Sequence, residues 1–429
     1  METSAIKKRK SPWAWIPTQY FAEGIPYVAV MTISVIMYKR LGISNTDIAL
    51  YTGWLYLPWV IKPLWSPFVD IISTKRRWIL VMQLIIGIAF ALIAFTLPGS
   101  LFFRLSLAVF WIVAFASATH DIAADGYYML ALTEHEQSFY VGIRSTFYRI
   151  ASVAGQGLLV IVAGCLETST GDIPLAWSVV FGILSVLFIG FSIYHSLILP
   201  HTEHPSDRGK NGSVKNIGQE FGKVFASFFR KHNIIPALLF MLLYRLPEAQ
   251  LVKLINPFLL DPEEAGGLGL STADVGIVYG TVGIIGLTLG GIIGGIAAAA
   301  RGLRFWLKPM AWSMSLTCLT FVYLSYAEAP SLLTINICVF IEQFGYGFGF
   351  TAYMLYLIYF SEGEFSTAHY SICTGFMALG MMLPGMAAGW IEEMIGYRCF
   401  FIWTMVCCIA TIGVTYLLDV NPSFGIKRK

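Results

Sequence analysis

The chain has 429 residues, of which 57% are hydrophobic and only 12% are charged. Soluble globular proteins carry about 25% charged residues, so this composition excludes a soluble fold with a water-exposed surface. The net charge of +3 is too small to indicate nucleic-acid binding. The seven cysteines mostly lie inside apolar runs without the spacing of a zinc site, so we expect no metal and no other cofactor.

The first apolar stretch follows a basic segment, Lys7 to Lys10, and contains Glu23 and Pro26. A secretory signal would end in a small-residue cleavage site, and none follows this stretch. We therefore expect an uncleaved first helix whose basic end stays in the cytoplasm.

Apolar runs of membrane-spanning length occupy most of the chain. A transmembrane helix needs about 20 mainly apolar residues, which excludes a two-span protein with large soluble domains. The predicted spans of the first half are 17–38, 47–69, 78–97, 102–131, 143–165 and 176–199. Those of the second half are 234–256, 273–299, 305–327, 331–360, 368–391 and 399–418.

Basic residues concentrate in alternate loops. With the first helix starting in the cytoplasm, the loops that follow even-numbered spans should be basic. These loops contain Lys75, Arg76, Arg77, the central stretch 200–232, Arg301, Arg304 and Lys308, and the chain ends in Lys427, Arg428 and Lys429. The opposite loops contain only Lys39, Arg40, Arg104 and Arg398. This asymmetry predicts an even number of helices and two cytoplasmic termini.

The stretch 200–232 divides the chain near its middle. Its first part is polar and Gly-rich, which is typical of a linker. From Val214 to Phe229, apolar residues recur at helical spacing among lysines, as in a helix that lies on a membrane surface. We predict an N-terminal six-helix bundle (1–199), this cytoplasmic connector, and a C-terminal six-helix bundle (233–429).

A weak internal repeat agrees with two equivalent halves. Asp125 to Leu132 resembles Phe350 to Leu357, and each segment is followed by an acidic turn. Parallel repeats of six helices are the pattern of the major facilitator architecture. The predicted fold class is thus an all-α polytopic membrane protein of about 12 transmembrane helices in two halves.

Several charged residues fall inside the predicted spans. A charge in hydrocarbon costs about 2.5–3.5 kcal/mol even on the lenient insertion scale, so such side chains face a lumen or a partner. They are Glu23, Lys62, Asp121, Asp125, Arg149, Arg245, Glu248, Lys253 and Glu342.

Asp121 and Asp125 are four residues apart and share one face of a helix. Two close carboxylates in a poorly hydrated site repel each other, which favours binding a proton. We expect this pair to couple proton movement to transport. The alternative is a buried ion pair with Arg149 or Lys62 that only holds helices together. His120, which precedes the pair, is more often a packed side chain than a proton relay.

Other intramembrane residues are candidate substrate ligands. The guanidinium of Arg149 can donate two hydrogen bonds to an anionic group, and Lys62 can bind an anion or extend toward the interface. Prolines beside Glu23 and Arg245 predict broken helices at corresponding places in the two halves, which often mark a transporter's central site. Arg245 and Glu248 can instead pair with each other. Glu342 and Gln343 are expected to face the cavity from the second half.

Asp70 ends the second predicted span, and Arg76 and Arg77 begin the third. We expect these residues to form a charge cluster that controls a gate. Anchoring by positive charges on the cytoplasmic side explains the arginines equally well, but not Asp70.

These segments resemble a known family. Lys62-Pro-Leu-Trp-Ser-Pro-Phe-Val-Asp70 resembles the second-helix motif of AmpG-type muropeptide permeases and the related acetyl-CoA transporters. Ala116 to Gly126 is similar to their fourth-helix pattern, Tyr148-Arg149 to a fifth-helix element and Gly24-Ile-Pro26 to a first-helix element. The resemblance covers mainly the N-terminal half. It implies a major facilitator fold, a proton-driven importer, and Lys62, Asp121, Asp125 and Arg149 as site residues.

Two positions depart from the family pattern. His120 stands in place of the family's glutamine, and Glu23 stands where many members have a small or uncharged residue. Both departures leave the substrate open among GlcNAc–anhydro-MurNAc with or without peptide, a sugar-only substrate such as anhydro-MurNAc, and a short peptide fragment.

We therefore expect a proton-coupled importer of cell-wall amino-sugar fragments in a bacterial inner membrane, acting as a monomer and not as an enzyme. Its partners would be the sugar substrate, protons and the lipid bilayer, without nucleic acid. One alternative is an acetyl-CoA or other organic-anion transporter of the same fold. Another is a membrane receptor that transports nothing.

Overall fold

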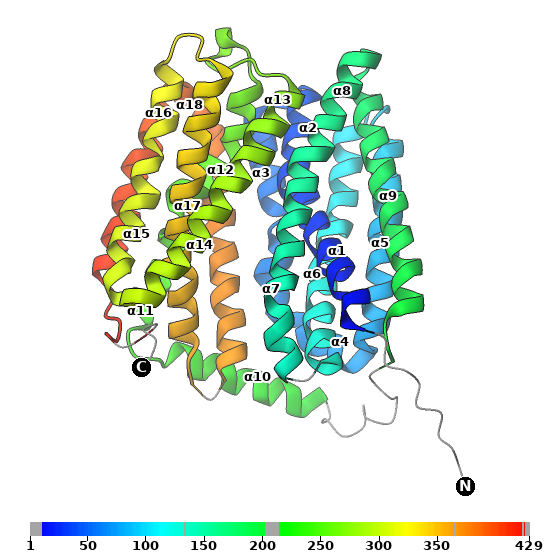
Figure 1. Ribbon diagram of the computed structural model, residues 1–429, viewed down its shortest axis with the longest axis vertical. Coiled ribbons are helices and arrows are strands. Elements are labelled where there is room, and N and C mark those ends of the chain that lie inside the picture. Colours follow the sequence, from blue (N-terminus) through cyan, green and yellow to red (C-terminus); the bar gives the residue numbers. More distant parts are fainter. Residues whose placement is uncertain (1–10, 133, 202–213, 364, 423, 425–429) are drawn as a thin grey trace.

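The computed structural model describes residues 11–132, 134–201, 214–363, 365–422 and 424. Throughout this part the regular structure is helical and contains no strand. Two groups of long, roughly parallel helices stand side by side, the first from the N-terminal half of the chain and the second from the C-terminal half (Figure 1). The predicted all-α polytopic fold class is confirmed.

The N-half begins with a short 3-10 segment and ends with a long apolar helix. Its helices are η1 (Pro12–Ala14), α1 (Ile16–Val28), η2 (Ala29–Ile33), α2 (Ser34–Arg40), α3 (Asn45–Trp54), α4 (Leu57–Ile72), α5 (Lys75–Thr96), α6 (Phe102–Ala131), α7 (Glu134–Val153), η3 (Ala154–Leu159), α8 (Val160–Thr170) and α9 (Ile173–Ile198).

The C-half follows the connector. Its helices are α10 (Val214–Phe229), α11 (Ile234–Leu243), α12 (Leu246–Leu260), η5 (Glu263–Ala265), α13 (Thr272–Ile277), η6 (Val278–Gly283), α14 (Ile284–Arg301), α15 (Leu303–Thr317), α16 (Leu319–Tyr326), α17 (Leu332–Ser361) and α18 (Ser366–Tyr416).

Nine helical stretches of the described chain are long and apolar enough to cross a membrane. The predicted spans 47–69 and 305–327 are absent from this set. Each is divided in the structure, the first between α3 and α4 and the second at Cys318. The last two predicted spans both lie in α18, where Gly396 has φ 73° and ψ 162° and interrupts the helical backbone. A positive φ is readily adopted by glycine, which permits the reversal here.

Aromatic and glycine packing hold each half together. In the N-half the buried Phe90 ring lies 5.8 Å from that of Phe181 and 5.5 Å from that of Phe188, which joins α5 to α9. In the C-half a Cβ atom on Gly290 would overlap the carbonyl oxygen of Phe344, so α14 and α17 approach backbone to backbone.

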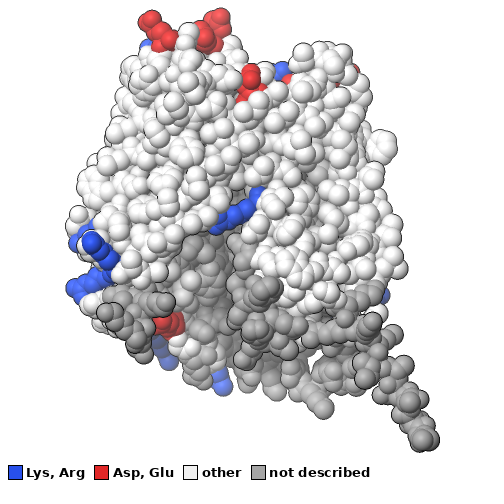
Figure 2. All heavy atoms as spheres, viewed as in Figure 1, with Lys and Arg blue, Asp and Glu red and all other residues white. Residues whose placement is uncertain are grey.

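The outer surface is suited to lipid. Figure 2 shows a broad face almost without charge, with acidic groups at its upper end and basic groups toward its lower end. Large apolar side chains are exposed around the bundle, among them Phe95 (83%) and Val186 (74%). A soluble monomer rarely exposes so much apolar surface, so we treat the chain as membrane-spanning.

Helix α10 lies across one end of the bundle (Figure 1). Its Phe228 is fully buried, and Lys231 Nζ donates hydrogen bonds to the carbonyls of Phe360 and Glu362 at the end of α17. Burial lowers the pKa of Lys231, which still caps that helix end. The connector is thus fixed to the C-half. We call this the connector end of the molecule and the opposite one the distal end.

Candidate functional site

Asp121 of α6 faces α4 across the N-half. Its Oδ2 accepts a hydrogen bond from Trp59 Nε1 at 3.2 Å and lies 3.7 Å from Lys62 Nζ. The side chains of Lys62 and Asp121 are 27% and 18% exposed, so the pair is partly screened by water. The structure therefore contains the Lys62–Asp121 ion pair that sequence reasoning left as an alternative.

Asp125, one turn further along α6, pairs with a residue that sequence reasoning missed. Arg144 of α7 places Nη2 2.6 Å from Asp125 Oδ1. The guanidinium also lies over the ring of Tyr20 at 4.5 Å and over that of Tyr128 at 5.4 Å. Arg144 lies at the edge of the predicted span 143–165, and it is not among the intramembrane charges that the sequence indicated.

Glu23 of α1 lies beside this pair. It is only 8% exposed, and its Oε2 has no hydrogen-bond partner among the described residues. Tyr20, one turn earlier on the same helix, lies under the Arg144 guanidinium. The N-half thus brings together Glu23, Asp121 and Asp125, with Lys62 and Arg144 as bases. We call these five residues the N-half cluster.

Arg149 lies on a different side of α7 from Arg144, because five residues turn a helix by about 140° beyond a full turn. It is exposed, and a Cβ atom on Gly291 of α14 would lie 3.9 Å from its Nη2. None of the described acids forms an ion pair with it. The structure does not bring Arg149 to the α6 acids but places it where α7 meets the C-half. Figure 2 shows basic atoms halfway up the seam between the halves.

In the C-half, Arg245 and Glu248 pair with each other. Arg245 Nε donates to Glu248 Oε2 at 2.8 Å and Nη2 donates to Oε1 at 3.1 Å. Arg245 also donates to Tyr346 Oη at 2.7 Å and lies 4.8 Å from the Phe350 ring centroid. The structure thus shows the alternative in which Arg245 and Glu248 pair with each other. Arg245 can bind a substrate only after this pair separates.

Two further charged groups of the C-half are buried. Glu342 is 2% exposed and accepts a hydrogen bond from the neighbouring Gln343 Nε2 at 2.8 Å. Lys253 of α12 is also 2% exposed and donates to Thr52 Oγ1 of α3 at 2.8 Å. This bond crosses between the halves, a role that the spacing of charges in the sequence could not show.

The predicted gate at the connector end is only partly described. The side chain of Asp70 lies outside the described residues. Arg76 donates from Nε to the Leu199 carbonyl at 3.0 Å and from Nη2 to the Ser196 carbonyl, so its guanidinium caps α9. The backbone N–H of Arg77 donates to Thr74 Oγ1 at 3.2 Å. A gating role for these three residues stays a prediction.

A polar network at the distal end joins the two halves. Lys39 Nζ lies 2.7 Å from Asp261 Oδ1 and donates to Asn45 Oδ1 at 2.8 Å. Asn45 Nδ2 donates in turn to Glu392 Oε2 at 2.8 Å and to Tyr397 Oη at 2.9 Å. A Cβ atom on Gly389 would overlap the Asn45 carbonyl oxygen, so the backbones of the halves touch here.

A second part of this network centres on Glu167 of α8. Its carboxylate accepts hydrogen bonds from Arg40 Nε at 3.0 Å, Trp177 Nε1 at 2.9 Å and Thr272 Oγ1 at 2.7 Å. Thr272 belongs to the C-half, so Glu167 also ties the halves together. We call the two parts the distal latch. Sequence reasoning missed it, because its members lie at helix ends far apart in the chain.

The distal latch joins the halves at one end of the seam, while the Asp125–Arg144 pair of the N-half cluster is partly exposed. Asp125 and Arg144 are 42% and 30% exposed although they lie inside the bundle. Asp125 is less than two turns from the end of α6 at Ala131. The pair is thus partly exposed and lies near the connector end of α6.

His120 belongs to the core of the N-half rather than to the seam. Its Nε2 lies 3.0 Å from Gln83 Nε2, and Gln83 Oε1 lies 2.9 Å from Nδ1 of His195. Both histidines are at most 1% exposed. This arrangement fits the packed, hydrogen-bonded role that the sequence favoured.

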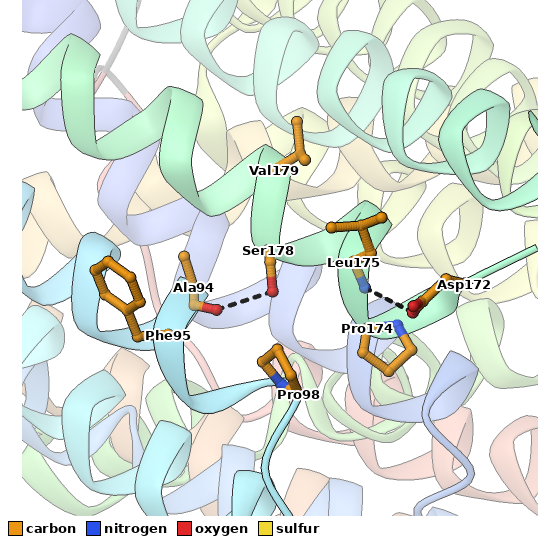
Figure 3. Close-up of a pocket in the computed structure, with 8 residues that line it drawn as sticks. All are labelled: Ala94, Phe95, Pro98, Asp172, Pro174, Leu175, Ser178 and Val179. Carbon is orange, nitrogen blue, oxygen red and sulfur yellow. Dashed lines mark hydrogen bonds between the residues drawn. The ribbon is translucent and has the colours of Figure 1, made fainter. Parts of the chain in front are cut away.

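A shallow groove on the outer side of the N-half lies between α5 and α9 (Figure 3). Its one acidic lining residue, Asp172, accepts a hydrogen bond from Leu175 N at 2.9 Å and caps α9. The exposed Phe95 at its edge faces outward, so the groove is separate from the seam. Among the described residues, no group of three or more His, Cys, Asp or Glu side chains could hold a metal ion.

Residues 19–364 match the sequence profile of the family described as Major Facilitator Superfamily. The chain belongs to the major facilitator superfamily. An anhydromuropeptide permease of Escherichia coli K12 is 27% identical to it over 421 residues, which cover 95% of this chain and 79% of that protein. The AmpG 4 transporter homologue of Rickettsia conorii is 24% identical over 417 residues, 93% of this chain and 94% of that one. The resemblance to AmpG-type permeases is confirmed.

Solved structures of other major facilitators share the fold. A bacterial homologue of the human lysosomal transporter Spinster, in an inward-facing and unoccupied conformation, superposes with a TM-score of 0.71 at 16% identity. That match covers 94% of this chain and 95% of the other. A D-xylose–proton symporter gives 0.70 at 12% identity over 96% and 97% of the two chains. These relatives are transporters, in agreement with the expectation that this major facilitator is not an enzyme.

Proposed function

We propose that this major facilitator imports acidic amino-sugar fragments of the cell wall, of the anhydro-muropeptide class, together with protons across a bacterial inner membrane. The observation that carries the proposal is the N-half cluster, where two aspartates and two bases form partly exposed ion pairs inside a membrane-spanning bundle. The similarity to an anhydromuropeptide permease supports the substrate class.

In this proposal the connector end faces the cytoplasm. The basic connector and the loop residues Arg301 and Arg304 then lie on the side that positive charges favour. The distal latch closes the path from outside, and the protein acts as a monomer in an inward-facing state.

Each charged group has a proposed role. Arg149, exposed at the seam, meets the carboxylate of the sugar lactyl group or of its peptide. Lys62 is a second ligand for that carboxylate once it leaves Asp121. Asp121 and Asp125 couple proton movement. Their bases, Lys62 and Arg144, can leave the aspartates and bind the substrate's carboxylate instead. Glu23, Arg245, Glu342 and Gln343 complete the wall of the site, and Asp70, Arg76 and Arg77 take part in gating.

A coenzyme A substrate is less well supported. Its several negative charges call for an excess of basic groups, whereas Lys62 and Arg144 are each paired with an aspartate. Arg245 is likewise neutralised by Glu248. Among the described residues nothing favours a signalling receptor.

Substrate competition in proteoliposomes tests the proposal. Exchange of labelled GlcNAc–anhydro-MurNAc-tripeptide should be inhibited by the unlabelled fragment and by anhydro-MurNAc, and far less by its methyl ester or by GlcNAc. Protein-free liposomes give the background. Inhibition by acetyl-CoA alone would reject this substrate class in favour of the organic-anion alternative.

A further inference from the structure

Of the three acids in the N-half cluster, one forms no ion pair with a base of the described part of the chain. Lys62 lies 3.7 Å from Asp121, and Arg144 lies 2.6 Å from Asp125. Glu23 is more deeply buried than either aspartate, and its Oε2 has no hydrogen-bond partner among the described residues. Lys62 and Arg144 are therefore each paired with an aspartate that is also partly exposed.

An ionised carboxylate in that position would be strongly disfavoured. Removing a charge from water without a counter-ion costs so much that the group is neutralised instead. The groups around Glu23 are Tyr20 on α1, Lys62 on α4, Asp121, Asp125 and Tyr128 on α6, and Arg144 and Tyr148 on α7. Their two positive and two negative charges cancel, so the cluster as a whole is neutral only when Glu23 carries a proton.

The C-half contains a matched comparison. In the internal repeat, Asp125 aligns with Phe350. The same residue offset between the halves aligns Glu23 with Glu248 and Tyr20 with Arg245. Glu248 is equally buried but accepts two hydrogen bonds from Arg245. At this shared position the C-half has Glu248, which is paired with Arg245. The N-half has Glu23, which forms no such pair with a described base.

The backbone around Glu23 favours a change of its surroundings. Pro26 lies inside α1 and removes one helical hydrogen bond, and the π-helical segment η2 follows. A Cβ atom on the adjacent Gly24 would lie 2.8 Å from Ala151 Cβ and 3.1 Å from the Tyr148 carbonyl of α7. Since α1 packs this closely on the helix that holds Arg144, a shift of one against the other alters the distance from Arg144 to Glu23.

We propose that Glu23 is the group that carries the transported proton, and that Arg144 triggers its release by moving from Asp125 to Glu23. This inference rests on the proposed proton-coupled transport. In the release step the O–H bond of the Glu23 carboxyl breaks and the proton passes to water at the connector end. Arg144 then stabilises the Glu23 carboxylate, while Asp125 stays exposed to water without its base.

The test uses the full-length protein in proteoliposomes with labelled GlcNAc–anhydro-MurNAc-tripeptide. Glu23→Gln imitates the protonated acid, so the ratio of gradient-driven accumulation to gradient-free exchange, measured in the same variant, reports coupling whatever exchange rate the variant retains. Accumulation driven by a pH gradient should fall to equilibration, and substrate-linked proton movement should vanish. The matched control Glu248→Gln should keep its pH-gradient dependence at whatever rate it retains.

The outcomes separate this inference from the proposed function. Wild type that neither exchanges nor accumulates the fragment would reject the proposed function itself. Glu23→Gln that still accumulates substrate to the wild-type ratio would overturn the role of Glu23. If that variant is not monodisperse after purification, Glu23→Asp decides: coupling should persist with a shifted pH midpoint, and an unchanged midpoint would overturn the inference.

Discussion

Lys39 and Asp261 form an ion pair of 2.7 Å that joins the two halves at the distal end. Both side chains are mostly buried, at 16% and 14% exposed, so water weakens the interaction less than at an open surface. Any state that opens toward the distal side must break this pair together with the hydrogen bonds of Asn45 and Glu167. The latch thus contributes to the balance between the closed and open states.

Lys39→Ala should shift that balance toward distal opening. A hydrogen-bonded charged pair contributes about 1.5–3 kcal/mol, which corresponds to a shift of roughly tenfold or more in the ratio of states. Spin labels at positions 47 and 264 would report the shift as a longer distance in pulsed EPR. Glu263→Ala in η5 is the control and should leave the distances unchanged. An unaltered distribution in Lys39→Ala would show that the pair does not stabilise the closed state.

Gly389→Ala should open the same seam for a steric reason. The added Cβ atom would overlap the Asn45 carbonyl oxygen, although alanine favours a helix more than glycine by about 1 kcal/mol. The same spin-label pair should therefore report opening without loss of helix content. Gly182→Ala, with open space around its Cβ position, is the matched control. Equal distances in the two variants would mean that the seam adapts without opening.

Arg149→Ala should weaken binding of acidic fragments more than binding of neutral ones. Loss of a charge-assisted hydrogen bond costs about 1.5–3 kcal/mol, so the affinity for anhydro-MurNAc should fall by about tenfold or more. A methyl-ester analogue, which lacks the charge, should lose much less. Competition binding with both ligands measures the difference. Equal losses would indicate that Arg149 only supports the packing of α7 near α14.

Asp125→Asn should abolish proton-driven accumulation and leave counterflow exchange partly intact. The substitution removes the charge that holds Arg144 at 2.6 Å and frees the guanidinium for Glu23. Transport assays with and without a pH gradient distinguish the two activities. Lys62→Met, which removes the base of the other pair, offers a comparison. Gradient-driven accumulation that survives in Asp125→Asn would remove Asp125 from the coupling mechanism.

The sequence predicted the fold well because the apolar runs and the loop charges depend on local composition. It also selected Asp121, Asp125 and Lys62, since a charge inside an apolar run is conspicuous wherever the helix packs. It did not identify Arg144 as the partner of Asp125, because that pairing depends on how α6 and α7 face each other. The two arginines of α7 look alike in the sequence, and only their different helix faces separate them.

The distal latch could not be predicted for a related reason. Lys39 and Asp261 lie at helix ends where charges are ordinary, and they belong to opposite halves of the chain. Their pairing depends on which end of the seam is closed, which local sequence does not encode. Arg76 shows the converse: the sequence suggested a gate, and the structure shows its guanidinium bonded to the end of α9.

In the proposed mechanism, substrate and proton move together through this protein. The most direct measurement of this coupling is proton entry into proteoliposomes that contain a pH-sensitive dye, followed as GlcNAc–anhydro-MurNAc-tripeptide is added outside without any imposed gradient. The lumen should acidify only when both substrate and protein are present, and the acidification should disappear in Glu23→Gln. Substrate uptake at the wild-type rate with no change in internal pH would contradict the proposed coupling.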